Sequence, residues 1–199
     1  MAGDLMASPR LMWSTITSPA GELIAVRSTS GIIRLGFVED GADRLVQDAE
    51  EQTGLPAARD DRALMELRGE IDAYFSGSMS TFATASDLSG INGFARRVLD
   101  AARAIPFGAV ATYGELATRA GSPRAQRAAG SAMRRNPVLL LVPCHRVVPA
   151  DGSIGGYSGR EDRKAFLLDH EAVVVGNADD DGRPGDPLPR LHRMATPDR

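Results

Sequence analysis

The sequence predicts a mixed α/β protein built from two parts. Three short runs rich in apolar and β-branched residues, at 11–17, 22–27 and 31–38, come before two segments with helical spacing. Later in the chain, a glycine separates two short helical patterns, as in a helix-turn-helix. Charge divides along the same line, because residues 1–93 hold 7 basic and 14 acidic side chains, whereas residues 94–170 hold 12 and 6. We therefore predict an acidic α/β domain at 11–88 and a basic domain at 93–175.

The N-terminal domain is expected to open with a three-stranded meander, since the turn sequence Ser18-Pro19-Ala20-Gly21 separates its first two strands. Helices are predicted at 43–52 and 61–75, and the second places an apolar face at i, i+3, i+7 and i+11. That face consists of Leu64, Leu67, Ile71 and Phe75. No catalytic constellation is visible here, so this domain is interpreted as a scaffold.

The segments that flank and join the domains are predicted from composition. Residues 1–10 form a loose leader, and residues 76–92, rich in Ser, Thr and Gly, form a linker with a short strand at 81–84. Residues 176–199 contain too few apolar side chains to fold alone and are expected to form a mobile tail.

The C-terminal domain is expected to start with an amphipathic helix at 94–104. Thr112 and Glu115 have the spacing of a capping box, which predicts a helix at 113–120. Gly121 ends this helix, and Ser122-Pro123 is expected to cap and open a second helix that continues to about residue 135.

The second of these helices combines small side chains with arginines. Alanines recur at helical spacing beside Gly130, and four arginines surround them. Such a helix fits a narrow groove in DNA, where bulky side chains would clash, but it also fits against a neighbouring helix. The residues are Arg124, Ala125, Arg127, Ala128, Ala129, Ala132, Arg134 and Arg135.

The only cysteine of the chain, Cys144, directly precedes His145 and Arg146. Imidazole and cationic neighbours lower the pKa of a thiol and so favour the reactive thiolate. If the chain stays extended after the apolar run 138–142, the side chains of Cys144 and His145 point to opposite faces. Either the backbone turns there or a water joins the two groups. The alternative is an unreactive cysteine that acts as a small buried apolar residue.

Composition narrows the classes of function. A single cysteine excludes an internal disulfide and a cysteine-cluster zinc site, and the three histidines are scattered at 145, 170 and 192. We expect no metal and no cofactor, since no phosphate-binding glycine loop is present. No apolar run approaches the length of a membrane span, and no secretory signal pattern opens the chain. The sequence thus predicts a cytoplasmic monomer without a membrane partner.

Three motifs carry a resemblance to a known family. The run PCHRV at 143–147, the preceding Asn136-Pro137 and the following GGYSG at 155–159 are similar to the active site of the O6-alkylguanine-DNA alkyltransferases, or methylated-DNA–protein-cysteine methyltransferases. The resemblance is dense over 94–172. It implies an RNase H-like N-terminal domain and a winged-helix-like helix-turn-helix domain that carries the cysteine. It also implies DNA repair by direct reversal, in which an alkyl group moves irreversibly from guanine O6 in double-stranded DNA to the cysteine.

The resemblance further implies roles for single residues. Cys144 would be the nucleophile, His145 a base acting through a water, and Glu171, expected just beyond a helix at 164–170, the group that orients the imidazole. Asn136 would hold the turn between the recognition helix and the active-site strand. Arg127 would enter the base stack from the minor groove and replace a flipped-out nucleotide. Further DNA contacts are implied for Tyr113, Arg124, Ala125, Ala128, Ala129 and Arg134, and a substrate pocket for Tyr113, Met133, Val147, Tyr157 and Ser158.

Two departures and two alternatives remain. The chain lacks the tryptophan that many relatives carry near Leu99 or Asp100, and it lacks the ligands of the N-terminal zinc site that some relatives have. A regulatory DNA-binding protein that marks lesions without repairing them is one alternative, although such relatives replace the cysteine. A thiol hydrolase that uses Cys144 and His145 is the other, and it leaves the basic, alanine-rich helix unexplained.

Overall fold

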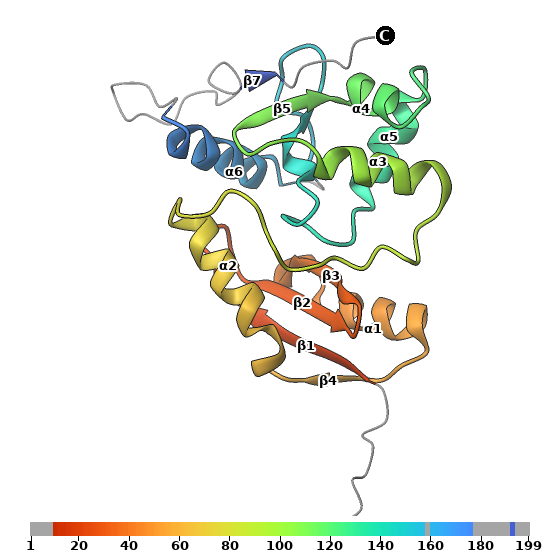
Figure 1. Ribbon diagram of the computed structural model, residues 1–199, viewed down its shortest axis with the longest axis vertical. Helices are drawn as coiled ribbons and strands as arrows, with labels where there is room; N and C mark the ends of the chain where they lie inside the picture. Colours follow the sequence, from red (N-terminus) through yellow and green to blue (C-terminus); the bar gives the residue numbers. More distant parts are fainter. Residues whose placement is uncertain (1–9, 158–159, 177–191, 194–199) are drawn as a thin grey trace, which may run out of the picture.

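The structure is a computed structural model that describes residues 10–157, 160–176 and 192–193. The predicted leader, most of the predicted tail and Ser158 lie outside the described residues. The described chain forms a lower layer from the N-terminal domain and an upper layer from the C-terminal domain, with the linker running between them (Figure 1).

The N-terminal domain contains the predicted meander. Strands β1 (Leu11–Ile16), β2 (Leu23–Ser28) and β3 (Gly31–Phe37) pair antiparallel in sequence order. A fourth strand that the sequence analysis missed, β4 (Ala57–Arg59), pairs parallel with β1 and gives the order β3-β2-β1-β4. Three residues are too few for a visible periodic pattern.

Two helices cover the sheet. Helix α1 (Ala42–Thr53) packs on one face, around Val26, Ile33 and Ala49, and α2 (Met65–Phe75) packs on the other. Two 3₁₀ turns, at Val38–Asp40 and Arg62–Leu64, precede these helices. Because both faces of β3 are buried, its sequence reads as a nearly continuous apolar run.

The predicted strand at 81–84 is wrong. The carboxylate of Glu70 accepts the backbone N–H groups of Ala83 and Thr84, each at 3.0 Å, so these donors are not available for strand pairing. The linker instead forms one isolated bridge, in which Ser86 lies beside Ile32 of β3. Gly31 permits this close approach, because a Cβ atom at that position would lie 2.5 Å from the carbonyl oxygen of Ala85.

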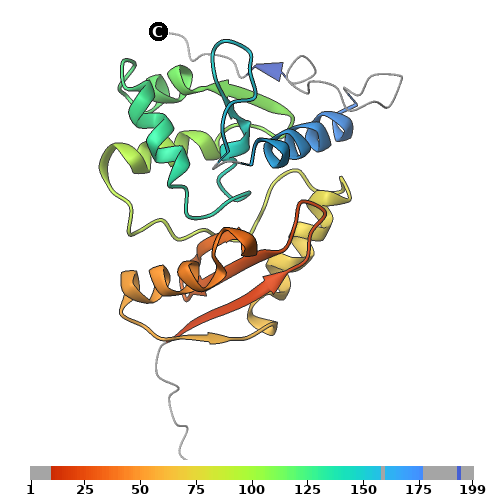
Figure 2. The ribbon, with the colours of Figure 1, turned by 180° about the vertical axis from the view of Figure 1, so that it is seen from behind.

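The C-terminal domain surrounds a small sheet of the order β6-β5-β7, in which β6 and β7 both pair parallel with β5. Helices α4 and α5 form the helix-turn-helix beside α3, and α6 packs near the other end of the domain (Figures 1 and 2). The elements are α3 (Gly93–Arg103), β5 (Ala109–Thr112), α4 (Tyr113–Arg119), α5 (Gln126–Arg134), β6 (Val147–Val148), α6 (Glu161–Val174) and β7 (His192–Arg193).

The structure confirms one predicted helix start and corrects another. Thr112 and Glu115 form the predicted capping box at α4, where the backbone N–H of Glu115 donates to Thr112 Oγ1 at 3.2 Å. Helix α5 begins only at Gln126, so Ser122 does not cap it. The backbone N–H of Ser122 donates instead to the carbonyl of Ala117, and Ser122 accepts from the N–H of Ala125, each at 2.9 Å, which makes 122–125 a turn.

The two domains share one hydrophobic core. Buried side chains of β3 and α2, among them Leu35 and Tyr74, belong to the same cluster as Val138, Leu141 and Cys144. The backbone of Leu35 also pairs with the segment before the cysteine, since its N–H donates to Pro137 at 2.8 Å and its carbonyl accepts from Leu139 at 2.9 Å. The N-terminal sheet therefore supports the chain that leads to Cys144.

Candidate active site around Cys144

A turn, rather than a strand, places the cysteine. Leu140 adopts a left-handed φ of 66°, and the N–H of Val142 donates to the carbonyl of Val138 at 3.0 Å. Cys144, His145 and Arg146 then form a single 3₁₀ turn. The expected active-site strand is therefore wrong, because the backbone turns at the cysteine.

The side chain of Asn136 holds this turn closed. Its Nδ2 donates to the carbonyl of Val142 at 2.8 Å, and its Oδ1 accepts the N–H of Val138 at 3.1 Å. One amide group thus fixes both ends of the segment that leads to Cys144.

Three polar groups face the thiol. Cys144 is 6% exposed, and burial raises the pKa of its thiol, while Asn136, Tyr157 and the charge of Lys164 act in the opposite direction. The hydroxyl of Tyr157 lies 3.9 Å from Sγ. The glycine-rich segment turns back to reach it through Gly155, whose φ is 71° and where a Cβ atom would lie 2.6 Å from the ring of Pro149.

Lys164 is a part of the site that the sequence analysis missed. Its side chain is fully buried, and its Nζ donates to the carbonyl of Val147 at 2.7 Å. Burial lowers the pKa of this amine to about 8, although Cys144 and Glu161 raise it. One signal was present in the sequence, because Lys164 is the only lysine among 23 basic residues.

Glu171 lies within α6 and not beyond the end of a helix as expected. Helix α6 continues to Val174, and the side chain of Glu171 is fully buried. Its Oε1 bonds to Nε2 of His145 at 2.8 Å, and Nε and Nη2 of Arg146 donate to the carboxylate at 3.0–3.1 Å. Burial alone would raise the pKa of Glu171, but the imidazole and the guanidinium outweigh it and bring the pKa to about 2.

The arrangement leaves one nitrogen of His145 available as a base. A carboxylate accepts hydrogen bonds, so Nε2 carries the proton that bonds to Glu171 and Nδ1 carries the lone pair. Nδ1 is buried and has no partner among the described residues. Burial lowers the pKa of His145, although Glu171 raises it, so the neutral imidazole is favoured.

A cavity of about 780 Å³ opens over the thiol. It brings together Tyr113, Met133 and Tyr157 of the predicted substrate pocket with Arg127 and Arg134 of the predicted DNA contacts. Val147 does not line it, since that side chain is fully buried and its carbonyl accepts from Lys164. Three further lining residues come from α5 and were not predicted from the sequence, namely Gln126, Gly130 and Ser131.

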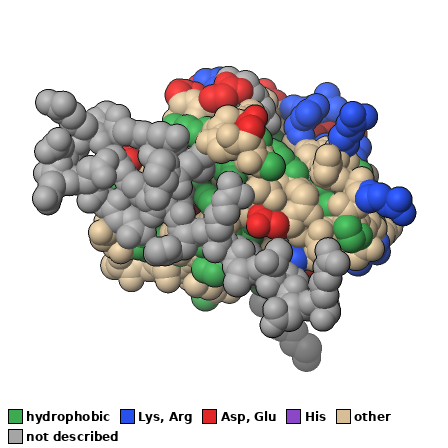
Figure 3. Space-filling view, turned by 90° about the horizontal axis from the view of Figure 1, so that it is seen from above, with side chains coloured by type: hydrophobic (Ala, Val, Ile, Leu, Met, Phe, Trp, Pro, Cys, Tyr) green, Lys and Arg blue, Asp and Glu red, His purple; other side chains and the backbone are tan. Residues whose placement is uncertain are grey.

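Helix α5 and the turn before it present a basic face to solvent. Arg124, Arg127, Ala128 and Arg134 are exposed, and Ala125 is half-buried. Basic side chains gather at the edge of the molecule where α4 and α5 lie (Figure 3). The implied DNA contact of Ala129 is wrong, because its side chain is fully buried in the core and cannot contact DNA in this conformation.

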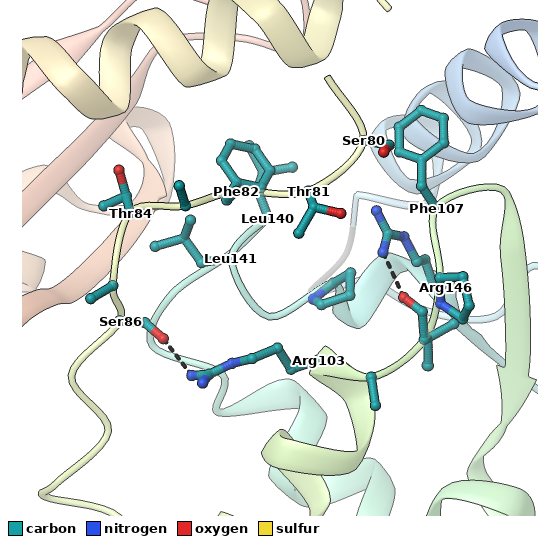
Figure 4. Close-up of a pocket in the computed structure, with 16 residues that line it drawn as sticks. Ser80, Thr81, Phe82, Thr84, Ser86, Arg103, Phe107, Leu140, Leu141 and Arg146 are labelled. Carbon is teal, nitrogen blue, oxygen red and sulfur yellow. Dashed lines mark hydrogen bonds between the residues drawn. The ribbon is translucent and has the colours of Figure 1, made fainter. Parts of the chain in front are cut away.

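A second cavity, of about 430 Å³, lies on the linker side of the turn that leads to Cys144 (Figure 4). The two arginines that line this cavity already have hydrogen-bond partners. Arg103 donates to Ser86, and Nη1 of Arg146 donates to the carbonyl of Ile105 at 2.7 Å. Cys144 does not line this cavity. We therefore place the candidate site at the α5 cavity.

In the described part of the chain, no group of three or more His, Cys, Asp or Glu side chains is arranged to hold a metal ion. No helix in the same part is long and apolar enough to cross a membrane.

Comparison with known proteins gives two family matches. Residues 11–88 match the ribonuclease-like domain of 6-O-methylguanine DNA methyltransferase, and residues 93–173 match its DNA binding domain. The predicted fold class, with a ribonuclease-like and a DNA-binding part, is thereby confirmed.

Relatives and solved structures agree with these matches. A methylated-DNA–protein-cysteine methyltransferase of Mycobacterium leprae is 37% identical, and the match covers 81% of this chain and 92% of the relative. One of Methanosarcina acetivorans is 32% identical, and the match covers 79% of this chain and 96% of the relative. The O6-methylguanine methyltransferase structure of Mycobacterium tuberculosis superposes with a TM-score of 0.70 at 34% identity, covering 81% and 92% of the two chains. The Mycobacterium tuberculosis OGT structure in complex with DNA gives 0.67 at 33%, covering 82% and 94%. This chain therefore belongs to the methylated-DNA–protein-cysteine methyltransferase family.

Proposed function

We propose that this protein repairs O6-alkylguanine in duplex DNA by moving the alkyl group onto Cys144, once per protein molecule. The observation that carries the proposal is the position of the chain's only cysteine, in a cavity that is also lined by the exposed Arg127 and the half-buried Tyr113 of the helix-turn-helix. Relatives named methylated-DNA–protein-cysteine methyltransferase, and the structure of one relative in complex with DNA, support it.

DNA recognition is assigned to α5 and the start of α4. The exposed small residues of α5 let its backbone approach the minor groove, and Arg124 and Arg134 would bind phosphates. The lesion must leave the base stack to reach Sγ, at a cost of roughly a few kcal/mol. The exposed guanidinium of Arg127 would fill the vacated space, while Tyr113 would line the pocket that receives the base.

The chemistry is a displacement at the alkyl carbon. A new S–C bond forms at Cys144 as the bond between carbon and guanine O6 breaks. Nδ1 of His145 would take the thiol proton through a water, and Glu171 would hold the imidazolium that results. Guanine regains a proton at N1, so in the net reaction the methyl group and one proton move in opposite directions.

Tyr113 is suited to assist the leaving group. It is half-buried in the cavity, and burial together with the nearby Cys144 raises the pKa of its hydroxyl. The hydroxyl therefore stays protonated at neutral pH and can donate a hydrogen bond to the guanine. Ser158, predicted to contact the same ring, lies outside the described residues.

The product would be a thioether, and the chain contains no second cysteine to resolve it. The protein would thus be consumed in the reaction. We also propose a cytoplasmic location, because a reducing compartment keeps the acceptor thiol available.

Loss of the lesion from DNA tests this function. Duplex DNA with one O6-methylguanine would be incubated with the protein at several ratios, digested to nucleosides and quantified, with Cys144→Ser as the control. We expect conversion to guanine that stops at one lesion per protein and is absent in the control. Binding without conversion would support the lesion-marking alternative, and the absence of both would support a thiol hydrolase.

A further inference from the structure

The N-terminal domain contributes one side chain to the buried network behind the cysteine. Tyr74 lies at the end of α2, and its hydroxyl donates to Oε1 of Glu171 at 2.7 Å. The two residues are 97 positions apart, and Tyr74 is only 1% exposed. This hydrogen bond joins the domain assigned above as a scaffold directly to the carboxylate that holds His145.

The hydroxyl of Tyr74 and the imidazole of His145 bond to the same carboxylate oxygen, at 2.7 and 2.8 Å. The other oxygen, Oε2, accepts the backbone N–H of Gly108 at 3.0 Å. A carboxylate offers about four acceptor positions in total, so donors to Oε1 share its charge. Nε and Nη2 of Arg146 also donate to Oε1, at 3.1 and 3.0 Å, so the Tyr74 hydroxyl is one of several donors on that oxygen. The hydroxyl takes up part of the charge that would otherwise attract a protonated imidazole, and it also fixes the plane of the carboxylate.

The surroundings hold the tyrosine ring in one place. Phe82 of the linker stacks on it with centroids 5.5 Å apart, and Phe107 meets it edge-on at 5.6 Å. Both rings also line the linker-side cavity (Figure 4). His170 contacts the ring at 5.2 Å and bonds through Nε2 to the backbone carbonyl of Tyr74 at 2.9 Å.

We propose that Tyr74 is a positioning residue for alkyl transfer: its hydroxyl orients Glu171 and limits how strongly this carboxylate binds the His145 imidazole. The inference rests on the proposed function and assigns the N-terminal domain a part in the same site. Burial keeps the hydroxyl protonated, since it raises the pKa of Tyr74 well above its ordinary value. The charged or titratable groups that face this network are Arg146, Lys164, His170 and Tyr157, and Cys144 lies beside Tyr157.

Tyr74→Phe removes the hydroxyl and keeps the ring. Without the Tyr74 donor, Glu171 binds the imidazolium more strongly, so His145 keeps its proton to a higher pH. We expect the NMR titration midpoint of His145 to rise by roughly one pH unit, the size expected for one lost hydrogen bond to a charged group. The acid limb of the methyl-transfer rate should move upward by the same amount.

Two further variants separate positioning from packing. Phe82→Leu removes a ring that stacks on Tyr74 without touching Glu171. It should lower the free energy of unfolding but leave the His145 titration midpoint and the acid limb of the methyl-transfer rate unchanged. Replacing Tyr74 with 3-fluorotyrosine strengthens the donor while preserving the fold, and it should move the His145 midpoint downward. This second variant keeps the test decisive if Tyr74→Phe does not fold.

The outcomes distinguish this inference from the proposed function. If the wild-type protein transfers methyl groups and neither Tyr74 variant moves the His145 midpoint or the acid limb, the role of Tyr74 is overturned and the function stands. If the wild-type protein never transfers a methyl group, the proposed function and this inference fall together.

Discussion

Nε and Nη2 of Arg146 both donate to the carboxylate of Glu171, at 3.0–3.1 Å, although the two side chains are 7% and 0% exposed. A buried ion pair of this kind is costly to break, because the remaining charge stays in the interior without a partner. The same carboxylate holds His145, so stability and chemistry depend on one side chain.

Glu171→Gln should therefore impair both the stability of the protein and the methyl-transfer reaction. We expect the free energy of unfolding to fall by about 3–5 kcal/mol, since the charge of Arg146 is left uncompensated. The methyl-transfer rate of the folded fraction should fall by at least about tenfold, because a neutral amide does not stabilise the imidazolium. Urea unfolding and single-turnover kinetics measure the two effects. Glu66→Gln, at a side chain 64% exposed, is the matched control and should change neither.

The same carboxylate predicts an acid limit to stability. The folded pKa of Glu171, about 2, lies below its ordinary 4.5, so its contribution is complete above about pH 4.5 and is lost as the pH falls toward 2. Unfolding free energies measured between pH 6 and the acid transition should show this loss in the wild-type protein. A Glu171→Gln variant with the same pH dependence as the wild type would contradict the assignment.

Lys164→Met should make Cys144 less reactive. The positive charge of Lys164 lowers the pKa of the Cys144 thiol, so its removal moves the onset of thiolate reactivity to higher pH. We expect a shift of roughly half to one pH unit in the rate of alkylation by iodoacetamide. Arg135→Met removes an exposed cation and should leave the profile unchanged. Equal profiles for all three proteins would show that Lys164 has only a packing role.

Asn136→Ala should loosen the turn that holds the thiol. The variant loses two hydrogen bonds, to Val142 and from Val138, and we expect a destabilisation of about 1–3 kcal/mol. Asn92→Ala offers a matched change at an exposed residue whose side chain makes no capping hydrogen bond to α3, and it should cost less than about 0.5 kcal/mol. Thermal unfolding of the pair is a sufficient comparison.

Arg127→Ala should separate DNA recognition from chemistry. Because Arg127 is exposed on α5, its loss should leave stability and the reaction of Cys144 with iodoacetamide unchanged. Methyl transfer from duplex DNA should fall by at least about tenfold, since nothing fills the space left by the flipped nucleotide. Arg62→Ala, an exposed arginine of the N-terminal domain, serves as the control. If both variants repair duplex DNA at the wild-type rate, α5 is not the recognition helix.

The sequence predicted those elements whose signals are local. The three β-strands and the Thr112–Glu115 capping box depend on neighbouring residues, and both are present. Strand β4 was missed because its three residues become a strand only through pairing with β1. The bridge between Leu35 and Val138 joins residues about a hundred positions apart, which no local pattern reveals.

The sequence predicted those residues of the site that belong to recognisable motifs. The motif pointed to Cys144, His145 and Glu171 but placed Glu171 beyond a helix end, because the apolar run after it was not recognised as a continuation of α6. Tyr74 belongs to the domain interpreted as a scaffold, and nothing in its local sequence shows that its hydroxyl reaches a carboxylate of the other domain. Ala129 was assigned to DNA because an alanine repeat does not indicate which of its faces is buried.

In the proposed reaction, Cys144 itself accepts the alkyl group. Intact-mass analysis after incubation with duplex DNA containing O6-methylguanine, followed by peptide mapping, tests this most directly. We expect a gain of one methyl group on the peptide that contains Cys144. The gain should stop at one equivalent and be absent in Cys144→Ala. Repair of the DNA without a mass gain, or a methyl group on another residue, would contradict it.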